Sequence, residues 1–559
     1  MTARELLEGL KFECIKTGRL EPDSDIRDLC YDTRKCSEGC AFIAIAGARF
    51  DGHDAVREAY SKGAALIVIE HDVETEGLDC DIIRVDSTRR ALSVMSANWF
   101  GNPARSLITI GLTGTKGKST TAYMIRHMLE GCGHKCGVIG TIGVEIGDSI
   151  YQTGNTTPES YVVQQYLRQM VDEGCDSLVM EVSSQALKQH RVSGILFNYA
   201  VFTNLESDHI GENEHADFGE YMYCKSLLFR QCEWAIGNSD DAHFNDVTCC
   251  GAPAPEGWPE STGYMYPVES FGCHGECDVR ADNIRLVDEP GRMGTEYELL
   301  ADGREALHVE LNVPGRFNVY NSLAALSVCR RILYEDAAEN AAKNRAENAA
   351  KNAAENAAEN AAGNEAENEA ENEAENEAEY LRLLQTAIET LSRTSVKGRL
   401  EYIPVSSRFS IMIDYAHNAM ALESLLNTLA EYNPKRLVCM FGCGGNRSKE
   451  RRYEMGEVSA RIADLTVVTS DNPRFEKPED IISDILEGVA KADGSYITIP
   501  DRREAIHYLM EHAEDGDMIV LAGKGQEDYQ EIEGVKYPMD ERVIVREIAE
   551  ELIASRGYV

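Results

Sequence analysis

The sequence predicts an α/β protein of three domains, and three observations support this fold class. The chain has 559 residues, which is too many for a single core and enough for three or four domains. Hydrophobic residues make up 43% and charged residues 27%, as in folded globular proteins rather than disordered or membrane chains. Short apolar runs alternate with amphipathic stretches, which is typical of parallel sheets covered by helices.

Seven apolar runs are the clearest strand candidates. They are Leu107–Leu112, Leu178–Met180, Tyr199–Phe202, Ile411–Ile413, Leu437–Phe441, Leu465–Val468 and Met518–Leu521. Nearly every unusual polar cluster follows one of these runs, and ligands bind at the carboxyl ends of strands in open α/β sheets. We therefore expect the clusters to share a site. Boundaries near Ala104 and Lys397 give domains over residues 1–104, 105–397 and 398–559.

The charge of the chain argues against two classes of partner. Acidic residues outnumber basic ones by 95 to 55, and the resulting net charge of −40 repels nucleic acid and anionic lipid surfaces. No apolar run approaches the roughly 18 residues of a membrane span, and the first residues lack the apolar core of a signal peptide. We expect a cytoplasmic protein whose 17 cysteines are reduced. Five residues have an alternative interpretation as a zinc site, although their spacing favours ordinary thiols: Cys249, Cys250, Cys273, His274 and Cys277.

Residues 335–379 form a low-complexity repeat of Ala, Glu and Asn. The segment carries fourteen acidic and three basic residues and no large apolar side chain. Because no face of it offers apolar surface to a core, we expect a frayed helix or a disordered excursion. We interpret it as a tolerated surface insertion, with a partner-binding arm as the alternative.

The strongest local motif is GTKGKST over Gly114–Thr120, between a predicted strand and a helix beginning near Lys118. In this context glycines let backbone N–H groups converge on phosphate oxygens, Lys118 supplies a charge to the β/γ-phosphates, and Ser119 offers a hydroxyl to Mg²⁺. The general pattern has a glycine where this chain has Leu112, so a Gly-rich turn is the alternative. We predict a P-loop-type ATPase domain that binds ATP.

This loop and the motifs around it resemble the Mur ligases, which build the peptide of bacterial cell-wall precursors. The matching segments in chain order are YDTR, GARFDG, NTTPES, MEVSSQALKQHRV, FTNLESDH, YCKSLLF, PGRFNVYNSLAA, GRLE, DYAH, FGCGGNR, DNPR and GKGQEDYQ. They span the chain apart from the repeat and residues 239–272. The resemblance implies a Rossmann-like C-terminal domain and an ATP-dependent amide ligase. Within the family, the combination resembles the ligase that adds the third amino acid to UDP-N-acetylmuramoyl-L-alanyl-D-glutamate in peptidoglycan synthesis.

The resemblance also implies the chemistry. A carboxylate is a poor electrophile, and the family makes it reactive by transferring the γ-phosphate of ATP to it, giving an acyl phosphate that the incoming amine attacks. Charge neutralisation by Mg²⁺ and positioning then account for most of the catalysis. The residues expected to act catalytically are Lys118, Glu181, His209 and Lys225. Ser119, Glu181 and His209 are the expected magnesium ligands, and Lys225 matches a lysine that is carbamylated in the family.

Two further sets of residues match family positions for ATP and for the nucleotide sugar. The ATP set is Gly114, Thr115, Lys116, Gly117, Lys118, Ser119, Thr120, Asn318, Asn321, Asp414 and His417. The UDP-muramoyl-dipeptide set is Tyr31, Thr33, Ala48, Arg49, Phe50, Asn155, Thr156, Thr157, Ser183, Gln189 and Arg191. Helix capping is the alternative for the two asparagines, and surface ion pairing is the alternative for the arginines.

The DNPR motif predicts which amino acid is added. In the family it accompanies meso-diaminopimelate, whose distal carboxylate a guanidinium grips bidentately, whereas L-lysine has no such group. The residues expected to bind diaminopimelate are Arg447, Asp471, Asn472, Pro473, Arg474, Gly523 and Glu527. An Arg474 paired only with Asp471 would be structural instead.

Two alternatives remain at this point. One is the same ligase adding L-lysine, and the other is a nucleotide-binding protein without ligase activity, which would need neither Lys225 nor the two arginines. We expect small-molecule partners only, ATP and Mg²⁺ as the cofactors, and a monomer.

Overall fold

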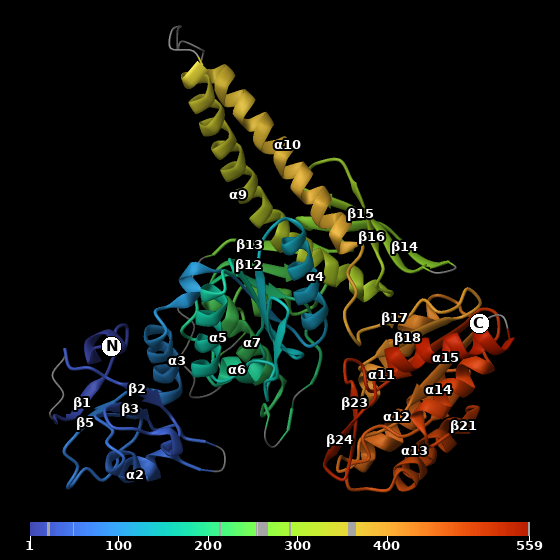
Figure 1. Cartoon of the computed structure of the whole chain (residues 1–559), viewed down its shortest axis with the longest axis horizontal. Coiled ribbons are helices and arrows are strands. Elements are labelled where there is room, and N and C mark those ends of the chain that lie inside the picture. Colours follow the sequence, from blue (N-terminus) through green and yellow to red (C-terminus); the bar gives the residue numbers. More distant parts are fainter. Residues whose placement is uncertain are drawn as a thin grey trace. The chain divides into compact units, whose positions relative to one another are not determined.

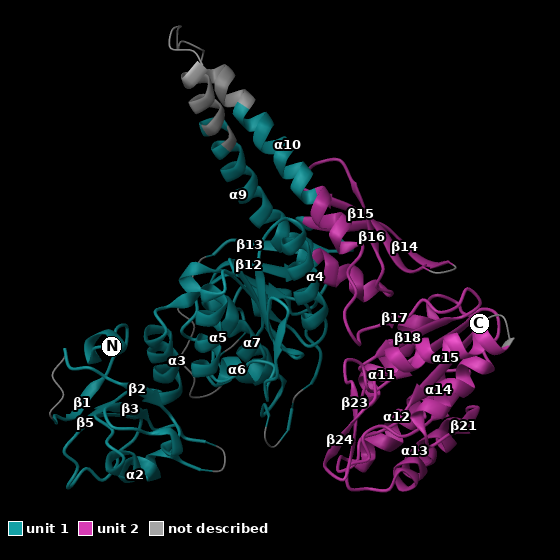
Figure 2. Ribbon diagram, in the orientation of Figure 1, with its two compact units in different colours: residues 1–278, 324–384 teal, residues 279–323, 385–559 magenta. Residues whose placement is uncertain are grey.

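The computed structural model describes residues 1–18, 23–47, 50–208, 210–211, 214–252, 254, 266–289, 292–355 and 365–556. Two compact units can be distinguished (Figure 2). Unit 1 comprises Met1–Asp278 and Ala324–Leu384, and unit 2 comprises Val279–Leu323 and Gln385–Val559. Each unit is described by itself.

Unit 1 begins with a five-stranded sheet of order β1-β5-β4-β3-β2, in which only β1 is antiparallel to its neighbour (Figure 1). Its strands are β1 (Glu13–Lys16), β2 (Asp28–Cys30), β3 (Cys40–Ile43), β4 (Leu66–Ile69) and β5 (Asp81–Arg84). Its helices are α1 (Ala3–Leu6), α2 (Val56–Ser61) and α3 (Thr88–Trp99). The apolar side chains of β3 and β4 are wholly buried, so this sheet forms the core of the N-terminal region.

The second sheet of unit 1 has the order β13-β12-β11-β6-β10-β7-β8-β9 and is parallel from β13 to β7. The strands are β6 (Ile108–Thr113), β7 (Cys136–Gly140), β8 (Gly143–Ile146), β9 (Ser149–Tyr151), β10 (Ser177–Glu181), β11 (Phe197–Phe202), β12 (Cys232–Asn238) and β13 (Val268–Gly272). The helices are α4 (Lys118–Gly131), α5 (Ser160–Asp172), α6 (Ser184–Lys188), α7 (Phe218–Ser226) and α8 (Phe244–Thr248). Since β6, β10 and β11 are parallel neighbours, the loops after them meet at one edge of the sheet.

Two long helices carry the Ala/Glu/Asn repeat: α9 (Arg316–Glu355) and α10 (Glu365–Leu391). Within unit 1 they lie side by side, with the rings of Tyr334 and Tyr380 5.5 Å apart (Figure 1). The expectation that no face of the repeat can pack is wrong at its beginning. Ala337 and Ala341, one helical turn apart, are buried, because a methyl group allows close packing where a larger side chain would not fit.

Unit 2 contains an antiparallel meander of β14 (Val279–Glu289), β15 (Arg292–Ala301) and β16 (Leu307–Leu311). Its main sheet has the order β17-β18-β22-β19-β20-β21 and is parallel except for β17. The strands are β17 (Glu401–Tyr402), β18 (Ser410–Asp414), β19 (Arg436–Phe441), β20 (Leu465–Val468), β21 (Tyr496–Thr498) and β22 (Asp517–Ala522), followed by the hairpin β23 (Tyr529–Ile532) and β24 (Val535–Pro538). The helices are α11 (Ala419–Ala430), α12 (Lys449–Ile462), α13 (Pro478–Ala492), α14 (Arg502–Glu511) and α15 (Glu541–Arg556).

The predicted α/β class with mostly parallel sheets is confirmed, and all seven predicted strands are present. The apolar runs predicted them because each strand is buried on both faces, so its side chains are apolar without alternation. The predicted domain boundaries remain a prediction. Among the described residues, no helix has both the length and the apolar character that crossing a bilayer requires.

Candidate functional site

The predicted phosphate-binding loop joins β6 to α4, as the motif requires. Gly117 precedes the helix with φ of +86°, a conformation that favours glycine. A Cβ at Gly114 would lie 2.0 Å from Thr203 Oγ1, so a side chain there would clash. Among the described residues, no side chain caps α4 at Gly117, which suits this helix end to an anion.

Residues after β11 hold this loop in shape. Asn204 accepts a hydrogen bond from the Lys116 N–H at 2.9 Å and donates to the Lys116 carbonyl at 3.0 Å. Thr203 Oγ1 donates to the same carbonyl at 2.7 Å. Sequence reasoning assigned no role to Thr203 or Asn204, although the FTNLESDH motif contains both. Their position directly after a predicted parallel strand was the available signal.

Two lysine side chains converge on the loop. Lys118 Nζ and Lys225 Nζ both donate to the Gly114 carbonyl, each at 2.8 Å. Lys225 lies on α7, is only 2% exposed, and its ammonium lies 4.5 Å from the centroid of the Tyr221 ring. Burial lowers the pKa of Lys225 well below its ordinary value, and the neighbouring charge of Lys118 lowers it further. Both effects favour the neutral amine form of Lys225.

Glu181 ends β10 beside the same loop and is buried. Its carboxylate accepts hydrogen bonds from Ser119 Oγ at 2.8 Å, from the Thr141 N–H at 2.9 Å and from Thr141 Oγ1 at 3.1 Å. The structure therefore brings together two of the predicted magnesium ligands, Ser119 and Glu181. The third, His209, lies outside the described residues.

Four residues predicted to bind the muramoyl-dipeptide are linked to one another next to Glu181. Thr157 Oγ1 donates to the Glu181 carbonyl at 2.8 Å and accepts from the Ser183 N–H at 3.1 Å. Arg191 donates to the Thr157 carbonyl and to Gln189 Oε1, each at 2.8 Å. The sequence separation of these residues is large, but they form one hydrogen-bonded group at the carboxyl edge of the sheet.

The remaining residues of that set are more dispersed. Tyr31 and Thr33 follow β2, with Tyr31 partly buried, and Phe50 is 62% exposed. Thr156 Oγ1 is 3.2 Å from Thr141 Oγ1, whereas Asn155 is exposed. Ala48 and Arg49 lie outside the described residues.

The predicted ATP residues of unit 2 have mainly local partners. Asn318, in the first turn of α9, donates to the Pro314 carbonyl at 2.7 Å and accepts from Asn321 at 2.8 Å, and both side chains are buried. Asp414 ends β18 and accepts from the Leu400 and Ala416 N–H groups at 2.8 Å. Shielding from water raises the pKa of Asp414. His417 is exposed, with Nδ1 2.9 Å from the Tyr415 carbonyl oxygen.

The loops that carry DNPR and GKGQEDYQ meet around a second buried lysine, Lys524, which is fully buried. Its ammonium contacts Asp471 at 3.1 Å and Glu527 at 3.3 Å, and it donates to Asn472 Oδ1 at 2.8 Å. Asn472 also donates to Glu527 at 2.8 Å. Gly523 precedes the lysine with φ of +108°, which again favours glycine. Lys524 thus joins three of the predicted amino-acid-binding residues, and sequence reasoning missed it.

Arg474 pairs with a different residue from the one considered in the sequence. Its Nε lies 3.1 Å from Glu531, and its Nη1 donates to the Gly445 carbonyl at 2.8 Å. The alternative of an Arg474–Asp471 pair is wrong, because Asp471 pairs with Lys524. Arg447 is exposed, and both arginines lie near Gly444, where an added Cβ would be 2.8 Å from Arg474 Nη1 and 3.8 Å from Arg447 Cγ. Pro473 packs against Gly445 in the same turn.

A third buried cation, also missed in the sequence, ties these loops to the sheet. Arg502 forms a buried ion pair with Glu541 at 2.8 Å. It also donates to the Ser470 carbonyl at 3.2 Å and the Ala522 carbonyl at 2.9 Å, which directly precede DNPR and GKGQ. One guanidinium thus fixes the starting points of both loops.

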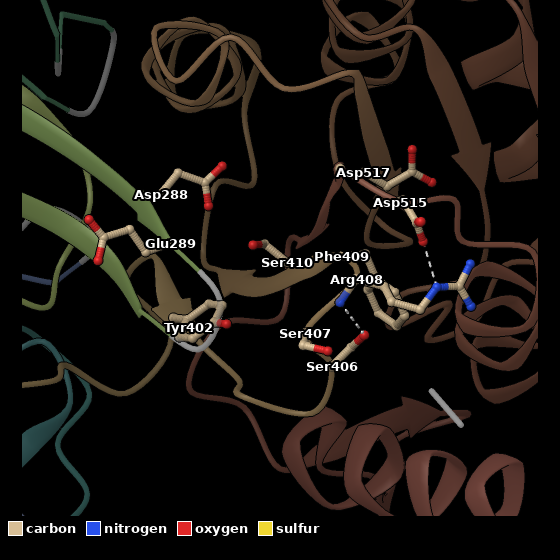
Figure 3. Close-up of a pocket in the computed structure, with 11 residues that line it drawn as sticks. Asp288, Glu289, Tyr402, Ser406, Ser407, Arg408, Phe409, Ser410, Asp515 and Asp517 are labelled. Carbon is tan, nitrogen blue, oxygen red and sulfur yellow. Dashed lines mark hydrogen bonds and ion pairs between the residues drawn. The ribbon is translucent and has the colours of Figure 1, made fainter. Parts of the chain in front are cut away.

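Two cavities of unit 2 lie apart from these loops. One, of ≈ 330 Å³, is lined by Asp288, Tyr402, Ser406 to Ser410 and Asp515 to Asp517 (Figure 3). Its residues include the starts of β18 and β22, at the opposite end of those strands from Asp414 and Gly523. The other, of ≈ 490 Å³, is lined by residues of β15, β16 and the 393–404 segment, with three arginines. Neither includes the predicted site residues.

Comparisons with known proteins agree with this geometry. The chain matches the Mur ligase family, catalytic domain over residues 25–100, the Mur ligase middle domain over 112–329, and the Mur ligase, glutamate ligase domain over 398–525. A relative from Clostridium botulinum, named UDP-N-acetylmuramoyl-L-alanyl-D-glutamate--2,6-diaminopimelate ligase, is 34% identical over 99% of this chain and 100% of its own length. One of the same name from Caldanaerobacter subterraneus subsp. tengcongensis is 36% identical over 98% of each chain.

Solved structures of ligases also resemble this chain over most of its length. A structure of a UDP-N-acetylmuramoyl-L-alanyl-D-glutamate--2,6-diaminopimelate ligase covers 99% of both chains with a TM-score of 0.65 and 25% identity. The MurF ligase from Thermotoga maritima, in complex with ADP, shares the fold with a TM-score of 0.51 at 18% identity, covering 95% of this chain and 99% of its own. Full-length likeness of sequence and fold leads to one conclusion: this chain belongs to the Mur ligase family.

Proposed function

We propose that this chain is an ATP-dependent ligase that adds meso-diaminopimelate to UDP-N-acetylmuramoyl-L-alanyl-D-glutamate in peptidoglycan precursor synthesis. The observation that carries the proposal is likeness over the full length, at 34% and 36% identity, to relatives that bear this name. The two domain boundaries, near Ala104 and Lys397, and the monomeric state belong to the same proposal.

The reaction joins a carboxylate to an amine, and ATP makes the carboxylate reactive. The D-glutamate side-chain carboxylate takes the γ-phosphate of ATP and ADP leaves; the amine of diaminopimelate then attacks the acyl phosphate, forming the amide with loss of a proton and release of phosphate. In this proposal Lys118 and the loop N–H groups of Gly114 to Thr120 bind the ATP phosphates. Asn318, Asn321, Asp414 and His417 complete the proposed set of ATP-binding residues.

The donor set beside the loop fits Mg²⁺. The Ser119 hydroxyl and the Glu181 carboxylate are hard oxygen donors 2.8 Å apart, at the helix end that suits phosphate. Together with His209 they would hold the ion, which neutralises phosphate charge when bound. Thr141 orients Glu181 through two hydrogen bonds, one to each carboxylate oxygen, and this support fixes the carboxylate whose Oε1 accepts from Ser119.

We assign Lys225 a modified form. A protonated lysine beside Lys118 and a magnesium ion would add repulsion, whereas a neutral amine can attack CO₂ to form a carbamate and release one proton. Burial and the Lys118 charge both favour the neutral amine by lowering the pKa of Lys225. The carbamate would replace a cation with an anion close to the phosphate-binding loop.

The amino-acid site is proposed around Arg474 and Lys524. Arg474 and Arg447 lie near each other and would bind the two carboxylates of diaminopimelate, one at each end. Asn472 and Glu527, which Lys524 holds together, would accept hydrogen bonds from the distal ammonium, with Gly523 and Asp471 beside them. L-lysine lacks the second carboxylate, so one of the two guanidinium groups would have no carboxylate of the amino acid to bind.

The nucleotide sugar would bind across the N-terminal and central sheets of unit 1. Thr157, Ser183, Gln189 and Arg191 form one group and are proposed to contact the muramoyl-dipeptide. Tyr31, Thr33, Ala48, Arg49, Phe50, Asn155 and Thr156 complete the proposed set.

The test is phosphate release together with product mass, using UDP-N-acetylmuramoyl-L-alanyl-D-glutamate, Mg-ATP and either meso-diaminopimelate or L-lysine. We expect turnover with diaminopimelate and at least about 10⁴-fold lower kcat/KM with L-lysine. Arg474→Ala should reduce kcat/KM for diaminopimelate far more than for L-lysine. Arg461→Ala, an exposed arginine paired with Glu423, is the matched control and should change neither.

Turnover with L-lysine but not with diaminopimelate would support the ligase activity. It would contradict the proposal that Arg474 binds a carboxylate of diaminopimelate. Binding or hydrolysis of ATP without amide formation with either amino acid would favour a nucleotide-binding protein and contradict the proposal.

A further inference from the structure

Three cysteine thiols meet in the N-terminal sheet, outside the site described above. Cys30 ends β2, Cys40 begins the adjacent parallel strand β3, and Cys36 directly follows the 3₁₀ turn Thr33–Lys35. Cys30 Sγ lies 2.9 Å from Cys36 Sγ and 3.5 Å from Cys40 Sγ, and the three sulfur atoms all lie within 4.8 Å of one another.

Cys30 and Cys40 belong to the hydrophobic core of the N-terminal sheet, and Cys36 packs against that core. In the part of the chain that the structure describes, these three residues are the sole group of three metal-ligating side chains composed of cysteines, and no such group includes Cys249, Cys250, Cys273, His274 or Cys277. Cys30 is 3% exposed and Cys40 is wholly buried, so the backbones of two strands fix these two thiols. Cys36 is half-buried, which opens the cluster to solvent on one side.

We propose that Cys30, Cys36 and Cys40 form a binding site for one thiophilic metal ion of the Zn²⁺ class, with three thiolate ligands and a fourth position open to solvent. A tetrahedral zinc ion with Zn–S bonds of about 2.3 Å separates its sulfur ligands by about 3.8 Å. The Cys30–Cys40 separation is close to this value. Cys36 has only to swing outward from Cys30, which its position at the end of a surface turn allows.

The charges around the cluster fit a bound cation. Each thiol that binds releases its proton, and three thiolates around a divalent ion leave one net negative charge. Lys62 lies beside this cluster, with its ammonium donating to the Thr33 carbonyl at 2.9 Å, and its positive charge would balance that negative charge.

The site would fix the turn that carries Tyr31 and Thr33. This consequence rests on the proposed function, in which both residues contact the nucleotide sugar, but metal binding itself does not. A result that contradicts the metal site would therefore not contradict the ligase activity, and the reverse also holds.

The experiment uses the full chain, purified with a phosphine reductant and freed of metal. Titration with Cd²⁺ as the probe, followed by the ultraviolet thiolate-to-metal charge-transfer band, should give one tight equivalent that Zn²⁺ displaces. The variant Cys30→Ser/Cys36→Ser/Cys40→Ser should lose this equivalent. Cys249→Ser/Cys273→Ser/Cys277→Ser is the matched control and should keep it.

A second variant guards against misfolding of the triple mutant. Cys36→Ser changes only the half-buried ligand, so it should keep the wild-type circular dichroism spectrum and weaken Cd²⁺ binding by at least about 10-fold. Tight Cd²⁺ binding that survives in the Cys30/Cys36/Cys40 variant, or that is lost in the Cys249/Cys273/Cys277 control, would overturn the proposal. The proposal would also be overturned if Cys30 and Cys36 form a disulfide in the purified protein and the chain binds no Cd²⁺ after that disulfide is reduced.

Discussion

Two buried lysines, Lys225 in unit 1 and Lys524 in unit 2, differ in what surrounds them. Lys524 contacts the carboxylates of Asp471 and Glu527 and the amide oxygen of Asn472. Lys225 donates to one carbonyl, which it shares with Lys118, and within the described residues it forms no ion pair. A buried ammonium is stable only when anions or several acceptors replace its water, so the two lysines should differ in charge and in chemistry.

The difference supports the proposal that Lys524 is a structural cation and Lys225 a reactive amine. Lys524 neutralises two carboxylates and joins the loops of the proposed amino-acid site, whereas Lys225 has its pKa lowered beside the phosphate-binding loop. Burial alone therefore does not assign a role to a lysine. The partner set does, and substitutions at the two positions should have opposite effects on stability.

The largest effect is expected for Lys524→Met. Removing the ammonium leaves Asp471 and Glu527 in a buried site without their cation, so the free energy of unfolding should fall by about 3–5 kcal/mol. Urea unfolding followed by circular dichroism measures this loss. Lys449→Met, which removes an exposed partner of Asp484, is the control and should change the midpoint little. Equal losses of unfolding free energy for Lys524→Met and Lys449→Met would mean that the buried Lys524 stabilises unit 2 no more than an exposed lysine in an ion pair.

Lys225→Met should affect turnover instead of folding. We expect kcat to fall by about 10²- to 10³-fold, as when one preorganised charge-stabilising group is lost, while the unfolding midpoint stays the same or rises. Phosphate release and urea unfolding of the same preparation give both values. A destabilised Lys225→Met protein that retains full turnover would make Lys225 a structural cation like Lys524.

The pH dependence of stability sharpens the comparison further. The pKa of Lys225 is lower in the folded state than its ordinary value of 10.5, so unfolding takes up a proton between the two values. Wild-type stability should therefore fall relative to Lys225→Met as pH falls through this interval, by up to about 1.4 kcal/mol per pH unit. Unfolding of both proteins at pH 7, 8 and 9 tests this slope. A constant difference would mean that Lys225 titrates normally in the folded protein.

The smallest effect is expected from shortening the repeat. Deleting residues 346–371 removes the distal parts of α9 and α10 but keeps buried Ala337, Ala341 and Tyr380. Turnover should stay within about 2-fold of wild type, because this segment contains neither Lys225 nor Lys524 and no proposed site residue. A large loss of activity, measured by phosphate release, would support a functional arm.

The sequence predicted those features that depend on local residue types. Buried parallel strands give apolar runs, and the phosphate-binding loop needs Gly114 and Gly117 at fixed positions, so both were visible. The meeting of Ser119 and Glu181 was expected from the family resemblance, which assigns both residues to one magnesium site, and the two side chains are hydrogen-bonded. The ligand roles of these residues remain predictions.

Other features depend on pairing between distant segments and were not visible. Apart from Glu527, the partners of Lys524 and Arg502 that join the two loops lie far away in the sequence, up to 53 residues, so neighbouring residues do not reveal them. Arg474 likewise pairs with Glu531 through the hairpin β23–β24 and not with the nearby Asp471. The meeting of Cys30, Cys36 and Cys40 requires the register of β2 on β3.

The most direct test of the contrast between the two lysines is ¹³C NMR of the protein in ¹³C-bicarbonate. We predict a carbamate resonance in the wild type that disappears in Lys225→Met and persists in Lys524→Met, because only a neutral buried amine takes up CO₂. Absence of the resonance in the wild type, or its survival in Lys225→Met, would contradict the assignment of Lys225 as the reactive lysine.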